Sequence, residues 1–207
     1  KHNLKAKAVL AAGLQIVYVD QINNEKIEWQ FENGLVDYLM DELQDRDIIP
    51  CPAFVATGEA ERASAEFAIC WNAEGGEQVQ ESYVNLIPTA QGGTHVNGLR
   101  SGVTDAMREF CELRNLLPRN LKLSAEDVWD GVNYILSLKF QEPQFSGQTK
   151  ERLSSREASS IVLNIAKDAF ALWLNQNSDT AMQLAEMMIA KAGRRLKAAK
   201  KVERKKI

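Results

Sequence analysis

The chain has 207 residues, 45% of them hydrophobic, and a formal net charge of −3 at pH 7. This is enough for one substantial core, or for one domain with a helical appendage. The chain holds no run of about 18 apolar residues, which excludes a transmembrane helix. Three scattered cysteines and two histidines exclude a disulfide framework and a zinc site, so we expect a reducing cytoplasm and no membrane partner. Since the chain begins at Lys1 instead of Met, we expect it to belong to something longer.

The first half of the chain is predicted to be rich in strands. Helical spacing of apolar residues stops at Gly13, and alternating apolar residues then flank the turn pair Asn23 and Asn24. Pro50 and Pro52 are expected to break the chain before alternation resumes. The predicted elements, in order, are a helix (residues 1–12), a hairpin (14–32), a short helix (34–43) and two strands (64–71 and 78–88). Several strands before any long helix favour an α+β fold.

The segment GGTH, residues 92–95, opens a predicted long helix that ends at Pro118. Its apolar stripe consists of residues spaced by three or four: Leu99, Val103, Ala106, Phe110 and Leu113. Arg100 lies off this stripe, where it either faces a ligand or pairs with an acid of the same helix, Asp105 or Glu109. Gly92 and Gly93 either bring N–H groups to an anion or only permit a tight turn. We expect His95 to orient or pack.

Residues 131–140 form the clearest predicted strand, and the polar stretch Gln141–Glu157 follows it. That stretch places Gln148 and Lys150 two residues apart at a loop tip, which is either a solvated turn or a site aimed at phosphate oxygens. Ser154 and Glu157 form an S-x-x-E pattern that predicts a capping box for the next helix. A last helix is predicted from about Asp179.

The chain ends in a basic segment, residues 191–206, with nine Lys or Arg and one Glu. Too few apolar residues follow Ile189 to bury this half of the last helix, so we expect it to project outward. Such a segment is either a solvated helix end or an attractor for a polyanion.

Three stretches, NLIPTAQGGTHVNGLR, AMREFCELRNLLPRNLKLSAEDVW and PQFSGQTKERLSSRE, resemble the transducer domain of the ATPase (B) subunit of bacterial type IIA topoisomerases. The stretches FALWLNQN and RRLKAAKKV look closer to topoisomerase IV than to gyrase. The resemblance spans almost the whole chain and implies an α+β fold: a mixed sheet packed with helices, a left-handed βαβ crossover of the ribosomal-protein and GHMP-kinase type, and a projecting C-terminal helix.

The resemblance also implies a domain plan and partners. Residues 1–12 would lead in from a GHKL ATPase domain, residues 13–175 would form the transducer, and residues 176–207 would lead toward a Toprim domain. The full-length protein would use ATP and Mg²⁺, pair with a second copy of itself and with the A subunit of topoisomerase IV, and act on duplex DNA. Its place would be the bacterial cytoplasm, at the nucleoid.

By the same resemblance, Gln148 and Lys150 match the QTK loop that contacts the ATP γ-phosphate, with Lys150 as the catalytic residue. Arg100 matches an arginine that lines the DNA cavity, and the basic helix residues Arg194, Arg195 and Lys197 are expected beside DNA. The chain lacks the GHKL asparagine, the catalytic glutamate, the ATP lid and the Toprim acids. We therefore expect a fragment that relays the nucleotide state, holds no cofactor alone and does not hydrolyse ATP.

Three alternatives stay open. One is the transducer of a gyrase B subunit, whose parent supercoils DNA negatively. Another is a stand-alone duplex-DNA-binding module, which would show steep salt dependence of binding. The third is a small-molecule kinase of the GHMP type, for which Gly92 and Gly93 alone are a weak phosphate loop.

Overall fold

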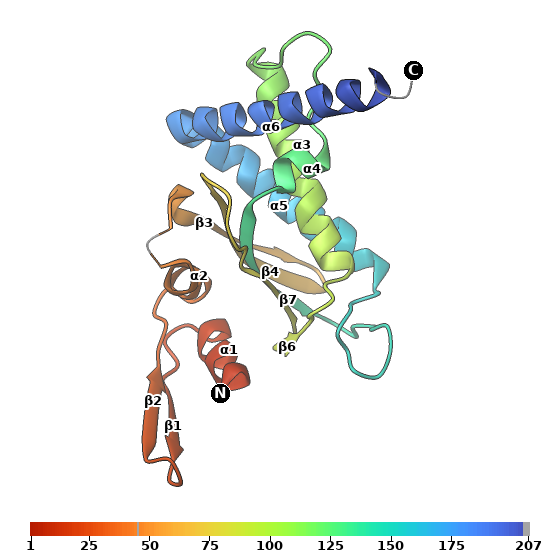
Figure 1. Cartoon of the computed structure of the whole chain (residues 1–207). Coiled ribbons are helices and arrows are strands. Elements are labelled where there is room, and N and C mark those ends of the chain that lie inside the picture. The colour runs from red at the N-terminus through yellow and green to blue at the C-terminus, as the bar shows by residue number, and fades with distance from the viewer. Residues whose placement is uncertain (45, 205–207) are drawn as a thin grey trace.

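The computed structural model describes residues 1–44 and 46–204. The helices are α1 (His2–Leu10), α2 (Leu35–Leu43), α3 (Thr94–Leu113), α4 (Ala125–Trp129), α5 (Arg156–Gln176) and α6 (Ser178–Arg204). The strands are β1 (Ile16–Asp20), β2 (Glu25–Trp29), β3 (Ile48–Ala60), β4 (Ala63–Asn72), β5 (Gln80–Val84), β6 (Ile87–Pro88) and β7 (Val132–Phe140). Figure 1 shows a central sheet between helices, with the β1–β2 hairpin reaching away from it.

The main sheet is mixed, which confirms the predicted α+β class. Its strand order is β3-β4-β7-β5-β6. The pair β5–β7 is parallel, and the other pairs are antiparallel. Because α3 lies between β5 and β7 in the chain, these elements form the expected βαβ unit. β1 and β2 pair only with each other among the described strands, in an antiparallel hairpin.

Helices cover both faces of the sheet, so β7 is buried on both sides. Val132, Leu136 and Leu138 belong to the larger core, beneath α3, α5 and the first half of α6. Ile135 faces the smaller core, which α1 and α2 close with residues such as Val9 and Leu39. On this second face Ile135 is the apolar residue of β7, whereas Asn133 and Ser137 are buried polar residues and Lys139 is exposed.

Close contact between α3 and α5 depends on glycine. A Cβ atom on Gly98 would lie 3.1 Å from the backbone nitrogen of Leu163, and closer still to the Ser159 carbonyl oxygen. A Cβ atom on Gly102 would lie 3.0 Å from the Ala166 Cβ, and closer still to the Leu163 carbonyl oxygen. The two helices therefore touch backbone to backbone, and they hold each other in one relative position.

The expectation that Pro50 and Pro52 break the chain is wrong, because β3 runs through both of them. β3 is an edge strand, where a missing N–H costs no ladder hydrogen bond on the open side. The register shifts between Ile49 and Phe54, which accommodates the two prolines. The single strand predicted over residues 78–88 is also wrong: a turn separates the antiparallel strands β5 and β6.

The end of α3 differs from the prediction as well. The helix ends at Leu113 rather than at Pro118, and Leu113 is 81% exposed instead of belonging to the buried stripe. The short helix α4 was not predicted. Ser124 and Asp127 form its capping box, in which each side chain accepts a backbone N–H of the other residue.

The basic end of the chain projects from the domain only in part. Ala181, Leu184, Met188 and Ala192 of α6 are buried in the larger core. The prediction that everything after Ile189 projects outward is therefore wrong for the first turn of the basic segment. Farther on, α6 extends past the other elements (Figure 1). Residues 205 and 206, which end the basic segment, and residue 207 lie outside the described residues.

Candidate functional site

Residues 141–155, here called the tip loop, join β7 to α5 and fold back on themselves. The outgoing and returning arms pair at Phe145 and Leu153. The Ser146 N–H donates to the Arg152 carbonyl oxygen at 2.9 Å, and the Ser154 N–H donates to the Gln144 carbonyl oxygen at 2.8 Å. The loop is thus a narrow two-armed finger, and Figure 1 shows it extending below the sheet.

The returning arm, residues 151–155, also lies against the start of α3. The Gln91 N–H donates to the Glu151 carbonyl oxygen at 2.9 Å, and the Thr94 N–H donates to the Leu153 carbonyl oxygen at 3.1 Å. Gly93 pairs with Leu153 in a parallel bridge. A Cβ atom on Gly93 would lie 2.6 Å from the Leu153 nitrogen. Gly93 therefore allows the backbone of the tip loop to approach the start of α3 closely. The sequence alone indicated only an anion contact or a tight turn for this glycine.

The tip itself is open to solvent. The side chains of Gln148 and Lys150 are exposed, on opposite sides of Thr149. Lys150 has a φ of 57°, in the left-handed region, and Gly147 has a φ of 81°. The tip therefore turns tightly and directs a cation and an amide away from the domain.

The capping box predicted from Ser154 and Glu157 is wrong. α5 begins at Arg156, and its N-cap residue Ser155 makes no side-chain cap hydrogen bond. Both serines bind the outgoing arm instead: the Ser154 hydroxyl donates to the Gln144 carbonyl oxygen, and the Ser155 hydroxyl accepts the Gln144 N–H. A long-range backbone partner has replaced the local cap, and it ties the loop to the start of α5.

His95 lies fully buried near the first turn of α3. Its Nε2 is 3.1 Å from the Thr89 hydroxyl, which in turn donates to the Ser82 carbonyl oxygen of β5. Burial lowers the pKa of His95 to about 4. The imidazole is therefore neutral near pH 7, and its contacts agree with the predicted orienting role rather than with proton transfer.

Arg100 lies on α3 between Gly98 and Gly102 and is half-buried. Its Nε is buried and has no hydrogen-bond partner among the described residues. The acids proposed as its partners bind other cations: Asp105 lies 3.6 Å from Arg108, and Glu109 lies 2.6 Å from Lys167. The structure thus gives no support to the predicted helix-internal pairing of Arg100.

The basic residues of α6 divide into two groups. Lys191 pairs with Asp130 at 3.3 Å, and Arg195 pairs with the buried Asp127 at 2.8 Å. Arg194 and Lys197 are exposed. Asp127 also accepts two hydrogen bonds from Ser124. Sequence reasoning missed Asp127, although its S-x-x-D spacing with Ser124 was the available signal.

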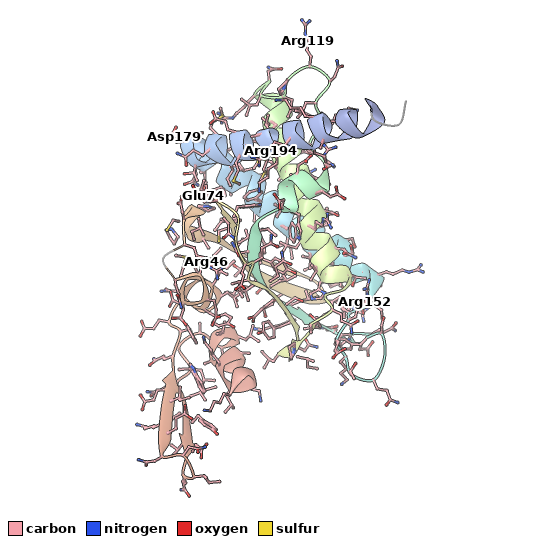
Figure 2. All side chains as sticks on the ribbon, viewed as in Figure 1. Arg46, Glu74, Arg119, Arg152, Asp179 and Arg194 are labelled. Carbon is pink, nitrogen blue, oxygen red and sulfur yellow. The ribbon has the colours of Figure 1, made fainter. Side chains whose placement is uncertain are left out.

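α3 separates the two sets of candidate residues. Its first turn contacts the tip loop, and its far end lies beside α6 (Figure 1). Figure 2 shows Arg152 on the tip loop well away from Arg194 on α6. The structure therefore places Gln148 and Lys150 on one exposed loop tip, apart from Arg194, Arg195 and Lys197 on α6.

Neither a metal cluster nor a membrane span is found in the described ranges. Residues 1–44 and 46–204 hold no group of three His, Cys, Asp or Glu side chains arranged to bind a metal ion. In the same part of the chain, each helix is too short or too polar to cross a bilayer. A polar recess of about 390 Å³ lies at the base of the tip loop. Its lining includes two positive side chains, Arg62 and Arg156, and two negative ones, Glu142 and Glu157, so their charges cancel.

Curated relatives match the entire chain. It is 60% identical over 207 residues to the B subunit of DNA topoisomerase 4 from Pseudomonas aeruginosa and 56% identical over 206 residues to that from Escherichia coli. In both comparisons all of this chain is covered, but it spans only 33% of the relative's length.

Solved structures of the same kind share the fold. The topoisomerase IV ATP binding domain of Francisella tularensis, in complex with a small molecule inhibitor, matches with a TM-score of 0.81 and 39% identity, over 94% of this chain and 52% of that one. The 43K ATPase domain of Thermus thermophilus gyrase B, in complex with an aminocoumarin, matches with a TM-score of 0.86 over 98% of this chain and 54% of that one. Its identity of 23% supports a likeness of fold alone. A family model described as DNA gyrase B matches residues 18–204, and the chain belongs to that family.

Proposed function

We propose that this chain is the transducer region of the ATPase subunit of an ATP-dependent type IIA DNA topoisomerase, of the topoisomerase IV type. In this role it couples ATP binding and hydrolysis in a neighbouring domain to closure of a DNA gate and to strand passage. The identities of 60% and 39% to topoisomerase IV relatives favour relaxation and decatenation over negative supercoiling.

The observation that carries the proposal is the tip loop. Its arms are fixed by backbone hydrogen bonds, while Gln148 and Lys150 are free to contact a ligand outside the domain. A lysine ammonium and an amide N–H are suitable donors for the γ-phosphate of ATP. Because ADP lacks this phosphate, such contacts favour one domain arrangement only when ATP is bound.

Mg²⁺ does not fit the described residues, since they offer no cluster of metal-binding side chains. We therefore assign Mg²⁺, with most of the ATP contacts, to the part of the protein outside this chain. Lys150 would add a positive charge where negative charge must be stabilised during phosphoryl transfer.

Duplex DNA is the second proposed partner, and a second copy of the same protein together with the A subunit of topoisomerase IV would complete the enzyme. Arg100, Arg194 and Lys197 offer positive charge without an acidic partner among the described ion pairs. Arg195 is the weaker candidate of this set, because Asp127 already holds it. Contacts between such cations and phosphates release counterions, so they weaken as salt rises.

The test is Lys150→Ala in the full-length protein. We expect ATP hydrolysis to fall about tenfold or more, because a lost charge-assisted contact costs on the order of 1.5–3 kcal/mol. ADP affinity should stay nearly unchanged, and Lys150→Arg should restore activity only in part. Equal weakening of ATP and ADP binding would contradict the sensor role.

A further inference from the structure

The returning arm, which follows Lys150 in the chain, is held by the start of α3 as well as by the outgoing arm of its own loop. Lys150 directly precedes Glu151, the residue at which the returning arm first contacts this segment. Besides the backbone bonds, the Gln91 amide donates to the Glu151 carboxylate at 2.7 Å, and the Thr94 hydroxyl donates to the Ser155 carbonyl oxygen at 2.7 Å. Contacts therefore hold the arm at both of its ends.

Gly93 lies at the centre of this junction and leaves no room for a side chain. An added Cβ would be 2.6 Å from the nitrogen and 2.9 Å from the Cα of Leu153, and closer still to its carbonyl oxygen. All three atoms are backbone atoms, and Leu153 is 1% exposed, so no flexible side chain can move aside. Gly93 also has a φ of 137°, which a residue with a side chain adopts only with strain.

The side of the junction that belongs to α3 is rigid. Gly98 and Gly102 place α3 in backbone contact with α5, the helix to which the returning arm connects. Any shift of the arm away from Gly93 therefore moves Lys150 relative to the whole α3–α5 pair.

We propose that Gly93 is a positioning residue for nucleotide sensing, which locks the returning arm onto α3 so that Lys150 is presented in its phosphate-contacting position. This inference rests on the proposed function of Lys150. In this inference Gly93, the second glycine of GGTH, does not bind a phosphate itself. It holds in place another loop, the tip loop, whose Lys150 contacts the phosphate.

The experiment is a double-mutant cycle in the full-length protein, with steady-state ATP hydrolysis and ADP affinity as readouts. Gly93→Ala should lower kcat/KM for ATP about tenfold and leave ADP affinity unchanged, as Lys150→Ala does. Gly93→Ala combined with Lys150→Ala should be no slower than Lys150→Ala alone, because both changes remove one contact. A purely structural role would instead make the two losses multiply, and that result would overturn the inference.

Gly75→Ala is the matched control, since an added Cβ there meets no atom within 4 Å, and it should behave as the unmodified protein. If Gly93→Ala does not fold, Thr94→Val removes only the hydroxyl bond to Ser155. It should lower kcat/KM about threefold, again without adding to Lys150→Ala. If either folded variant hydrolyses ATP at the unmodified rate while Lys150→Ala is impaired, the positioning role of Gly93 is refuted and the proposed function of Lys150 stands. Unchanged hydrolysis in Lys150→Ala would refute the proposed function and this inference together.

Discussion

The tip-loop junction and the basic end of α6 both present exposed charge, but different kinds of contact hold them. At the junction, backbone atoms meet backbone atoms, and glycines at 93, 98 and 102 allow the approach. On α6, ion pairs of Lys191 and Arg195 with acids of the α4 region hold the helix. Backbone contact fixes position at any ionic strength, whereas ion pairs at the surface weaken as salt rises. The first arrangement suits the phosphate contact proposed for Lys150, and the exposed Arg194 and Lys197 beside the ion pairs suit the proposed contact with a long polyanion.

The largest expected effect tests the backbone contact. Gly98→Ala should lower the free energy of unfolding of the chain by about 3 kcal/mol, the upper end of the range for overpacking, because the new methyl group meets the backbone of α5. Urea denaturation at low and high salt gives the measurement, and the loss should be the same in both. Gly193→Ala is the control on α6: its added Cβ meets no atom within 4 Å, and alanine should stabilise that helix slightly. A loss below that of an ordinary surface substitution would mean that α3 and α5 can separate without cost.

The next effect concerns pH at the start of α3. Burial lowers the pKa of His95 from 6.5 to about 4 in the folded chain. The neutral form stabilises the fold fully above pH 6.5, and this stability is lost as the pH falls toward 4. Between pH 7 and pH 5 the loss should be about 2 kcal/mol. His95→Gln should flatten this part of the stability curve, measured by urea denaturation at both pH values. An unchanged slope in that variant would show that other groups cause the pH dependence.

The smallest effect separates the two neighbouring arginines of α6. Arg195→Gln should lower the urea midpoint of the chain, and more at low salt than at high salt, because it breaks the two-bond pair with the buried Asp127. Burial alone would raise the pKa of Asp127, but hydrogen bonds from Arg195 and Ser124 outweigh it and hold that pKa below its usual value. Arg194→Gln should leave the midpoint unchanged, since the Arg194 side chain is exposed.

For duplex binding by the full-length enzyme we expect the reverse. Arg194→Gln should reduce the slope of log affinity against log salt by about one, and Arg195→Gln should reduce it less. Equal effects of both substitutions on both measurements would contradict the proposal that Arg195 is structural and that Arg194 faces DNA.

Much of the fold could be predicted from apolar periodicity, because periodicity records which side of an element is buried. The hairpin, α2, β4, β7, the start of α3 and the change from α5 to α6 all lie where the pattern places them. Gln148 and Lys150 could likewise be assigned to an exposed loop tip from their polar surroundings and the strand that precedes them. The route of β3 through Pro50 and Pro52 could not, because its edge position depends on strand order.

By itself, the sequence determined the local elements and the residues that carry charge at the loop tip and on the last helix. Only the tertiary structure decided which polar groups find distant partners. Ser154 and Ser155 bind the outgoing arm instead of capping α5, Arg195 binds Asp127 instead of solvent, and Gly93 accommodates Leu153 rather than only a turn. The physical reason is that a local pattern fixes what a side chain or a glycine can do, whereas the partner brought near by the fold fixes what it does.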